Sequence, residues 1–444
     1  MKFFETIRNI WKIEDLRNRL LTTLLFVLIY RFGSFIVLPG IDPTALTALH
    51  AQTEGGLMAL LDMFSGGAFS NASIFALGIM PYISASIIVQ LLSIAIPYFQ
   101  KMQKEGESGR QKMNQITRYL TVAILLFQGP SYLVNLSVQM AAAGQRLEIG
   151  LNAFTIISTI ILTAGSMFVM WLGERITDRG IGNGISFIIL IGIIARLPGS
   201  LIQEFSSRLN DAGGGLVVFL IEIVIWIVII AFAIALTQGT RRIPVQYAKR
   251  IEGNRQYGGV RQFIPLKVNA ANVMPIIFAQ AIMFIPIAIV GFQNSGSAFV
   301  AAFSNMDGFW YNLVFAILII AFTYFYTAVI INPVQMAESL KINNGFIPGV
   351  KPGRKTAEYI DTIMSRITLP GSILLAIIAV LPAFARLCGV SHGFAQFFGG
   401  TSLLIMVGVL LDTLQQIESH LMMHHYDGFF DSGMRIKGRG VSAY

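Results

Sequence analysis

The sequence predicts an all-α polytopic membrane protein with ten transmembrane helices, and three observations support this fold class. Charged residues make up 12% of the 444 residues, about half the roughly 25% found in ordinary soluble domains. Apolar runs recur along the whole chain, most of them near the roughly 20 residues that cross a bilayer core. All but five of the 32 Lys and Arg residues fall in alternate gaps between these runs. The positive-inside rule therefore places those gaps, and both termini, in the cytoplasm.

The positions of the apolar runs define the ten predicted spans. In chain order they are Leu20 to Leu38, Ile74 to Ile96, Tyr119 to Ala142, Leu151 to Leu172, Ile185 to Ile202, Leu216 to Leu236, Val268 to Phe292, Phe309 to Ile331, Ile367 to Leu387 and Gly399 to Ile417. Five basic residues precede the first run and five follow the second. Two follow the fourth run, seven the sixth, five the eighth and three the tenth. The first run lacks a small-residue cleavage pattern, so we expect it to stay in the mature protein.

A glycine-rich stretch divides the spans into two groups of five. Gly213, Gly214 and Gly215 follow a polar segment and separate an N-terminal half, residues 1–212, from a C-terminal half, residues 213–444. Because each half holds an odd number of spans, the two halves must have opposite orientations in the membrane. Related folds in this arrangement are inverted repeats, which place a pathway between the halves.

The loop after the first span contains a short apolar segment. No Lys or Arg occurs from Pro39 to Asn71, and Met58 to Phe64 forms an amphipathic turn and a half before Ser65-Gly66-Gly67-Ala68. Because irregular backbone at membrane depth survives only against protein or a wet cavity, we interpret the segment as a re-entrant half-helix. A helix on the surface of the external loop is an equally good interpretation of the residues alone. The paired glycines lower the cost of a sharp turn in either case.

Two cytoplasmic loops, residues 237–267 and 332–366, are much longer than a helix connection requires. Loops of such length are usually functional or disordered, and the prolines and glycines here favour defined turns. Their Lys and Arg residues could serve only to orient the chain in the membrane, but that role does not explain why the loops are so long. A docking surface for a large acidic or RNA-containing partner explains both features.

The titratable residues give little support to an enzyme. His420, His424 and His425 cluster near the C-terminus, but Leu421 stands where an H-E-x-x-H metal site has Glu. The single Cys388 excludes a disulfide within the chain. We therefore predict neither a catalytic residue nor a cofactor, and the net charge of +9 needs no DNA partner to explain it.

A secondary transporter of a small solute is the stronger alternative, since inverted repeats and broken helices suit it. Such carriers usually need ionisable residues near the membrane midplane. The candidates within the spans are few, namely Arg31, Glu222 and Asp412, and none of them has an obvious partner across the repeat. A proton or sodium relay is therefore poorly supported.

One long segment resembles a known family. Residues Ser73 to Ile88, SIFALGIMPYISASII, are similar to the second-span signature of SecY, the central subunit of the bacterial protein-translocation channel. Four further segments agree in order and position: Lys104 to Arg110, Trp171 to Glu174 with Gly180 to Gly184, Tyr247 to Arg250 with Leu266 to Asn269, and Gly399 to Ile405. The resemblance covers essentially the whole chain. It implies a ten-helix clamshell around an hourglass pore, which passes unfolded preproteins across the plasma (inner) membrane and releases hydrophobic segments sideways into lipid.

The resemblance also selects a pore ring that the residues alone would not reveal. An isoleucine in a span more often faces lipid or a neighbouring helix. By similarity, the ring consists of Ile79, Ile83, Ile189, Ile277 and Ile405. Aliphatic side chains suit this place because apolar constrictions can gate by dewetting.

A plug and a lateral gate follow from the same resemblance. The plug is the re-entrant segment of residues 58–72, with Met63, Phe64, Ser65, Gly66 and Gly67 at its centre, and we expect a lack of charge there that suits reversible seating. The lateral gate lies between spans 2, 3, 7 and 8. Polar groups worth about 0.6 kcal/mol each can exchange hydrogen bonds as those helices part. The polar gate residues are Ser84, Ser86, Gln90 and Gln128.

Partners are likewise implied by similarity. The long loops would bind the ribosome or the SecA motor through Arg242, Lys249, Arg250, Arg255, Lys351 and Arg354. Lys351 stands where the bacterial family generally has Arg, and the exchange loses the planar fork of a guanidinium. SecE and SecG would complete a heterotrimer. The chain lacks a G-x-x-x-x-G-K-[ST] motif, so we expect energy to come from a motor, from translation or from the membrane potential.

Overall fold

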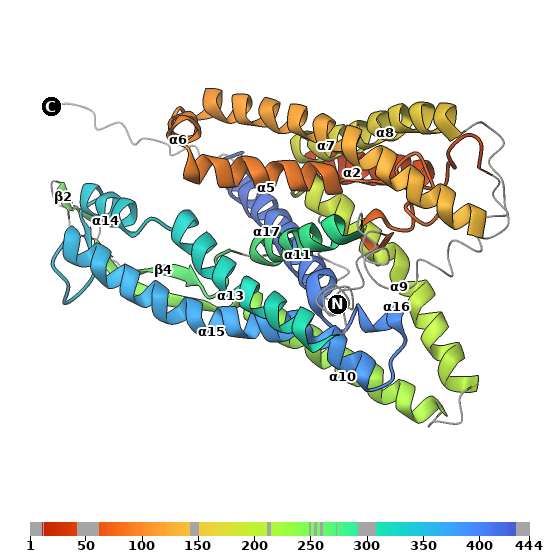
Figure 1. Ribbon diagram of the computed structural model, residues 1–444. Helices are drawn as coiled ribbons and strands as arrows, with labels where there is room; N and C mark the ends of the chain where they lie inside the picture. Colours follow the sequence, from red (N-terminus) through yellow and green to blue (C-terminus); the bar gives the residue numbers. More distant parts are fainter. Residues whose placement is uncertain are drawn as a thin grey trace, which may run out of the picture.

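A computed structural model describes residues 11, 13–41, 62–142, 151–210, 215–247, 250–252, 255–257, 261–271, 273–291 and 308–431. These residues are mostly helical (Figure 1). The helices are α2 (Glu14–Gly33), α5 (Met80–Ala95), α6 (Pro97–Lys104), α7 (Glu107–Ala142), α8 (Leu151–Arg179), α9 (Gly184–Asn210), α10 (Gly215–Gln238), α11 (Met274–Gly291), α13 (Phe309–Ile330), α14 (Pro333–Ile342), α15 (Arg354–Leu387), α16 (His392–Ala395) and α17 (Gly400–Asp431).

The helices confirm a polytopic membrane protein. Within the described ranges, seven segments are long and apolar enough to cross a membrane, or eight if the bent pair of α5 and α6 forms one broken span. The two remaining predicted spans coincide with α2, which carries Arg17, Arg19 and Arg31, and with α11, which has 18 residues. The count of ten spans stays a prediction.

The second span begins later than its predicted bounds. The sequence places its start at Ile74, whereas α5 begins only at Met80. Residues 66–79 form turns instead, because Gly66, Gly67 and Gly78 adopt positive φ, a conformation that glycine reaches without steric cost. Pro81 then occupies the first turn of the helix, where its missing N–H breaks no hydrogen bond.

The long cytoplasmic loops contain strands, which the sequence did not reveal. The strands are β1 (Thr240–Tyr247), β2 (Arg250–Glu252), β3 (Arg255–Tyr257), β4 (Arg261–Lys267) and β5 (Gly345–Phe346). Strand β1 lies between β4 and β5, antiparallel to both, while β2 and β3 form a hairpin. Since β5 belongs to the second long loop, the two loops form one unit (Figure 1).

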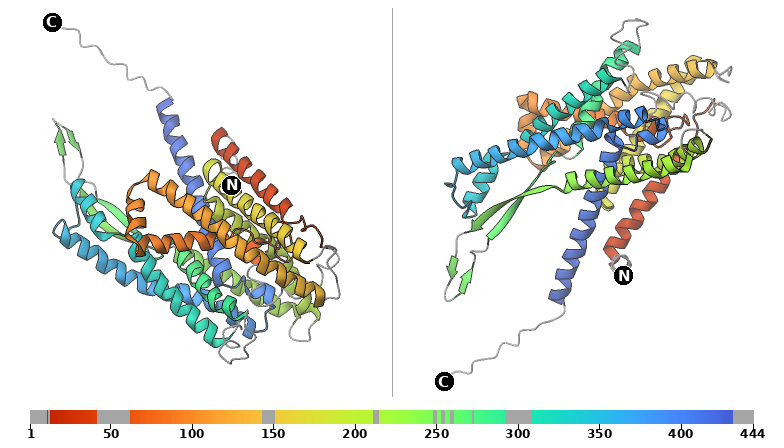
Figure 2. Two further views of the ribbon diagram at one scale, coloured as in Figure 1. Left: turned by 45° about the horizontal axis from the view of Figure 1, so that its top comes forward. Right: turned by 90° about the horizontal axis from the view of Figure 1, so that it is seen from below.

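The helices pack in two groups, with contacts between the groups concentrated on α9. In the first, α8 packs against α2, α7 and α9, and α5 packs against α7. In the second, α13 packs against α11 and α15, and α17 packs against α10 and α15. Helix α9 contacts both α10 and α17, and the Gly182 amide before it donates to Gln416 Oε1 at 2.8 Å. Figure 2 shows α17 passing through the middle of the molecule.

Candidate functional site

The five isoleucines of the predicted ring come together in one apolar cluster at the centre of the protein. Ile79, Ile189 and Ile405 are only 4%, 3% and 2% exposed, and the partly buried Ile83 and Ile277 pack against the same cluster. These side chains come from the start of α5 and from α9, α11 and α17. The cluster thus brings apolar side chains of both helix groups together.

The first turn of α5 fixes two members of this cluster. Ile79 is the N-cap residue of the helix, and the Ile83 amide donates to the Ile79 carbonyl at 3.1 Å. Residues four positions apart lie on one face of a helix, so both side chains reach the cluster together. The turn at Gly78, with φ of 53°, redirects the chain immediately before them.

The described residues of the predicted plug pack into the same cluster. Met63 and Phe64 are 3% and 6% exposed and belong to the cluster that contains the ring isoleucines. Gly66, at φ of 65°, lies so close to its neighbours that a Cβ atom there would stand 2.8 Å from both Arg31 Nη1 and Gly192 Cα. Only glycine fits this contact. Residues 58–61 of the predicted plug lie outside the described residues.

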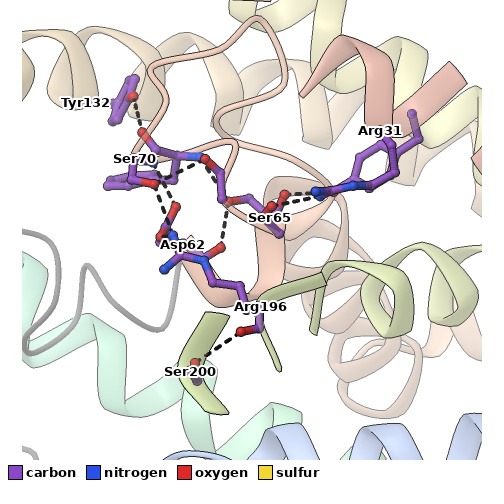
Figure 3. Close-up of polar contacts among 11 residues, drawn as sticks. Arg31, Asp62, Ser65, Ser70, Tyr132, Arg196 and Ser200 are labelled. Atoms are coloured by element: carbon purple, nitrogen blue, oxygen red, sulfur yellow. Dashed lines mark hydrogen bonds and ion pairs between the residues drawn. The ribbon is translucent and has the colours of Figure 1, made fainter. Parts of the chain in front are cut away.

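Polar contacts hold the turn that follows Phe64 (Figure 3). Tyr30 Oη donates to the Ser65 carbonyl at 3.0 Å, and Arg31 Nη1 donates to the Gly66 carbonyl at 2.8 Å. Asp62 forms an ion pair with Arg196 of α9. The expectation of a plug without charge was therefore wrong. Asp62 precedes Ser65 and the paired glycines, and its Oδ1 atom accepts the Ser70 amide that follows them.

The lateral-gate residues divide into two sets. Gln90 on α5 donates to Ser86 Oγ at 3.4 Å and accepts from Tyr326 Oη of α13 at 3.0 Å. Ser84 hydrogen-bonds within its own helix, where it donates to the Met80 carbonyl at 3.1 Å. Gln128 is exposed on α7. The structure thus joins spans 2 and 8 through Gln90. The structure also places Tyr326 at the predicted gate, a residue that the sequence distinguishes only as a hydroxyl within an apolar span.

The sheet unit presents the predicted docking residues on its surface. Arg242 is exposed on β1, Lys351 is exposed in the turn after β5, and the Arg354 side chain is 92% exposed at the start of α15. Gly349 and Gly353 adopt φ of 85° and 93° on either side of Lys351, which gives the turn its shape. A buried apolar core that includes Ile243, Val245 and Leu340 holds the unit together.

Three of the six docking residues are less fully described. Lys249 lies outside the described residues, and Arg250 and Arg255 are placed only as backbone positions of β2 and β3. Acidic residues accompany the basic surface, and one of them, Glu358, accepts a hydrogen bond from Lys355 at 3.1 Å. That hydrogen bond, aided by the Lys355 and Arg354 charges, lowers the pKa of Glu358. The carboxylate therefore stays ionised and offsets part of the local positive charge at neutral pH.

The charged residues within the spans have partners that the sequence did not reveal. Glu222 of α10 pairs with Arg208 of α9 at 2.5 Å, and Arg208 also pairs with Glu204 at 2.9 Å. Arg31 contacts the plug. The interpretation that none of these residues has an obvious partner across the two halves was thus wrong for Glu222, because Arg208 belongs to the N-terminal half. Asp412 is exposed near the cytoplasmic end of its span. In the part of the chain that the structure describes, no three His, Cys, Asp or Glu side chains gather as a metal site.

Comparisons with known proteins agree with this geometry. The SecY family model matches residues 73–414. The "Protein translocase subunit SecY" of Streptomyces griseus is 44% identical over 440 residues, covering 96% of this chain and 99% of the relative. The protein of the same description from Corynebacterium glutamicum is 43% identical over 437 residues, covering 94% of this chain and 98% of the relative.

Two solved structures share the fold. One, described as a protein conducting channel, has a TM-score of 0.61 at 16% identity and covers 91% of this chain and 92% of that chain. The other, Sec61 in the canine ribosome-channel complex from the endoplasmic reticulum, has a TM-score of 0.57 at 16% identity with the same coverage. At this identity they show the fold, and the curated relatives show the family. The chain belongs to the SecY family of protein-conducting channels, which translocate proteins across membranes.

Proposed function

We propose that the isoleucine cluster is the constriction of an hourglass pore between residues 1–212 and residues 213–444, with Met63 and Phe64 of the plug seated against it. The observation that carries this proposal is the cluster itself. It gathers isoleucines from α9, α11, α17 and the start of α5, and it includes the plug residues. A channel for unfolded chains must accept every kind of side chain while leaking few ions. A yielding aliphatic constriction meets both needs because a narrow apolar passage excludes water.

Photocrosslinking from position 79 to a stalled secretory chain tests the proposal. A photoreactive residue at Ile79 should form an adduct with a preprotein arrested in transit, because the extended chain must pass the constriction. The matched control places the same residue at Leu220, which is 55% exposed on α10 and faces away from the cluster. A small-solute transporter would give no polypeptide adduct at Ile79, so the absence of an adduct there would favour that alternative.

We propose further that α5 and α13 part sideways to release hydrophobic segments, and that the Gln90–Tyr326 hydrogen bond is one of the contacts that separate. Such contacts are weak in membranes, about 0.6 kcal/mol on average, and a gate that opens repeatedly requires weak contacts.

Tying α5 to α13 should stop lateral release. In a Cys388→Ser background, the pair Gln90→Cys and Tyr326→Cys can be bridged by a short bismaleimide. We expect bridged channels to lose signal-sequence insertion, whereas the unbridged pair keeps most of it, because the bridge holds the two helices together. Insertion assays on proteoliposomes before and after bridging measure this. Full insertion by the bridged channel would show that the opening lies elsewhere.

We propose that the basic sheet unit docks the SecA motor or the ribosome. A solved relative of the same fold is a ribosome-channel complex, and the exposed Arg242, Lys351 and Arg354 offer the positive surface that phosphates or acidic side chains attract. SecE and SecG are proposed as the other subunits, in a plasma membrane with both chain termini cytoplasmic. Signal sequences and unfolded preproteins are the proposed cargo.

Charge reversal on this unit should weaken docking without preventing assembly. We expect Lys351→Glu with Arg354→Glu to weaken SecA or ribosome binding about tenfold at low ionic strength, and less at high salt because surface charges are then screened. The control Arg17→Glu reverses an exposed charge on α2, outside the sheet unit. Cosedimentation with reconstituted channels measures the binding. Equal affinities for the two variants would remove the turn around Lys351 from the docking surface.

A further inference from the structure

We propose that Arg196 of α9 and Asp62 of the plug form an electrostatic latch that sets how readily the plug leaves the constriction. The inference rests on the proposed function, since it takes residues 62–72 as the plug. It goes beyond that function by naming the residues that position the plug and by separating plug release from the parting of the two helix groups.

The Asp62 carboxylate is held on both of its oxygens. Its Oδ2 atom pairs with Arg196 Nη2, and its Oδ1 atom accepts the Ser70 amide at 2.8 Å. Arg196 Nη2 also donates to Ser70 Oγ at 3.0 Å, so one guanidinium contacts both ends of the turn between residues 62 and 70 (Figure 3). Asp62 is 1% exposed. A buried carboxylate requires such a partner, because an unpaired charge in the interior is strongly destabilising.

Helix α9 has one face shaped for this contact. Gly192 lies four residues before Arg196, and residues four apart share a helix face. A Cβ atom on Gly192 would stand 2.6 Å from the Phe64 carbonyl oxygen, so glycine is required for the backbone of the plug to reach α9. The close approach at Gly192 and the charge at Arg196 together form a seat for the plug.

A second cation supports the turn from α2. Arg31 Nη1 donates to the Gly66 carbonyl at 2.8 Å, next to the bond from Tyr30 Oη to the Ser65 carbonyl. These carbonyls end the helical turn of residues 62–65, where a positive charge is favourable. Tyr132 Oη of α7 adds a bond to the Phe69 carbonyl at 2.9 Å. Two arginines on two helices thus hold one turn.

The polar contacts described for the plug all come from one half of the chain. They come from α2, α7 and α9, all in the N-terminal half, whereas the apolar cluster around Met63 and Phe64 also includes Ile405 of α17. When the helix groups part, the plug loses apolar contacts with α17 but keeps its polar anchors. Plug release is therefore a separate step, in which the Asp62–Arg196 pair must break.

Resting ion conductance of the complete channel complex in planar bilayers tests the latch. We expect Arg196→Gln to raise this conductance about tenfold, because removing one partner of a buried pair destabilises the seated state and each 1.4 kcal/mol changes a population about tenfold. Asp62→Asn should raise it less, since an uncharged side chain remains buried. Arg196→Lys, which keeps a positive charge beside Asp62, should raise conductance much less than Arg196→Gln, and a merely structural loss of the arginine would not show this difference.

Two controls make the outcomes decisive. Arg118→Gln breaks a bidentate pair with Glu174 that joins α7 to α8 away from the plug, and it should leave conductance unchanged. Met63→Ser with Phe64→Ser tests the seal itself. If this pair leaks while Arg196→Gln does not, the latch is overturned and the plug assignment stands. If neither leaks, the plug assignment fails as well.

Discussion

Channels with glycine in place of both Ile79 and Ile405 are expected to conduct ions at rest at least about tenfold more than the unmodified channel, because water enters a constriction that loses its aliphatic lining. The two side chains come from α5 and α17, one from each half, and both are almost fully buried in the central cluster. Planar-bilayer recordings of the complete complex measure the change.

The matched control is Ile378→Gly. Ile378 is fully buried in α15 and belongs to the other large apolar cluster, which contains none of the ring isoleucines. Truncating a buried isoleucine to Ala costs about 2 to 5 kcal/mol, so we expect the control to lose a substantial amount of stability as well. Only the ring variant should leak. Leakage from the Ile378 variant, or a tight ring variant, would show that conductance reports general loosening rather than the constriction.

The sequence predicted those parts of the fold that depend on burial in lipid. The apolar runs from Leu216 and from Phe309 coincide with α10 and α13 to within two residues at each end, because backbone in a bilayer core must satisfy its own hydrogen bonds and a helix does so. Helices α7 and α15 extend well beyond their predicted spans. Hydropathy predicts where a span leaves the membrane. It does not predict where the helix ends, because polar residues beyond the membrane can continue the helix.

The parts that the sequence missed depend on long-range partners. In β1, Ile243 and Val245 are buried and alternate with exposed residues, a pattern of period two that the dense positive charge of the loop concealed. Asp62 lies 134 positions before Arg196, and Tyr326 lies 236 positions after Gln90. No local pattern predicts such a pair. The five ring isoleucines were selected by resemblance to a family, and the structure then brings them into one cluster.

A buried charge network joins the two halves, and removing one of its members is expected to be strongly destabilising. Arg208 near the end of α9 contacts Glu204 at 2.9 Å, Glu222 of α10 at 2.5 Å and the Gly389 carbonyl at 2.7 Å. Glu204 also accepts the Ser391 amide at 2.9 Å. The three charged side chains are 13% exposed or less. One guanidinium thus joins α9, α10 and the segment between α15 and α16.

Arg208→Ala should therefore lower the free energy of unfolding by about 3 to 5 kcal/mol, because it leaves two buried carboxylates without their cation. Arg19→Ala, which breaks an exposed pair with Asp15 on α2, should cost only about 0 to 1 kcal/mol. Reversible unfolding of both variants in mixed micelles measures the difference.

A triple variant separates charge from packing at this junction. Combining Arg208→Met with Glu204→Gln and Glu222→Gln removes every charge of the network while keeping side chains of similar size. Replacing a whole buried ion pair by well-packed apolar groups is often neutral, whereas removing one partner leaves an uncompensated buried charge. The triple variant leaves no such charge. The triple variant should consequently be more stable than Arg208→Ala. If it is equally unstable, the loss comes from the packing of the long Arg208 side chain between α9 and α10, and the charges contribute little to holding the two halves together.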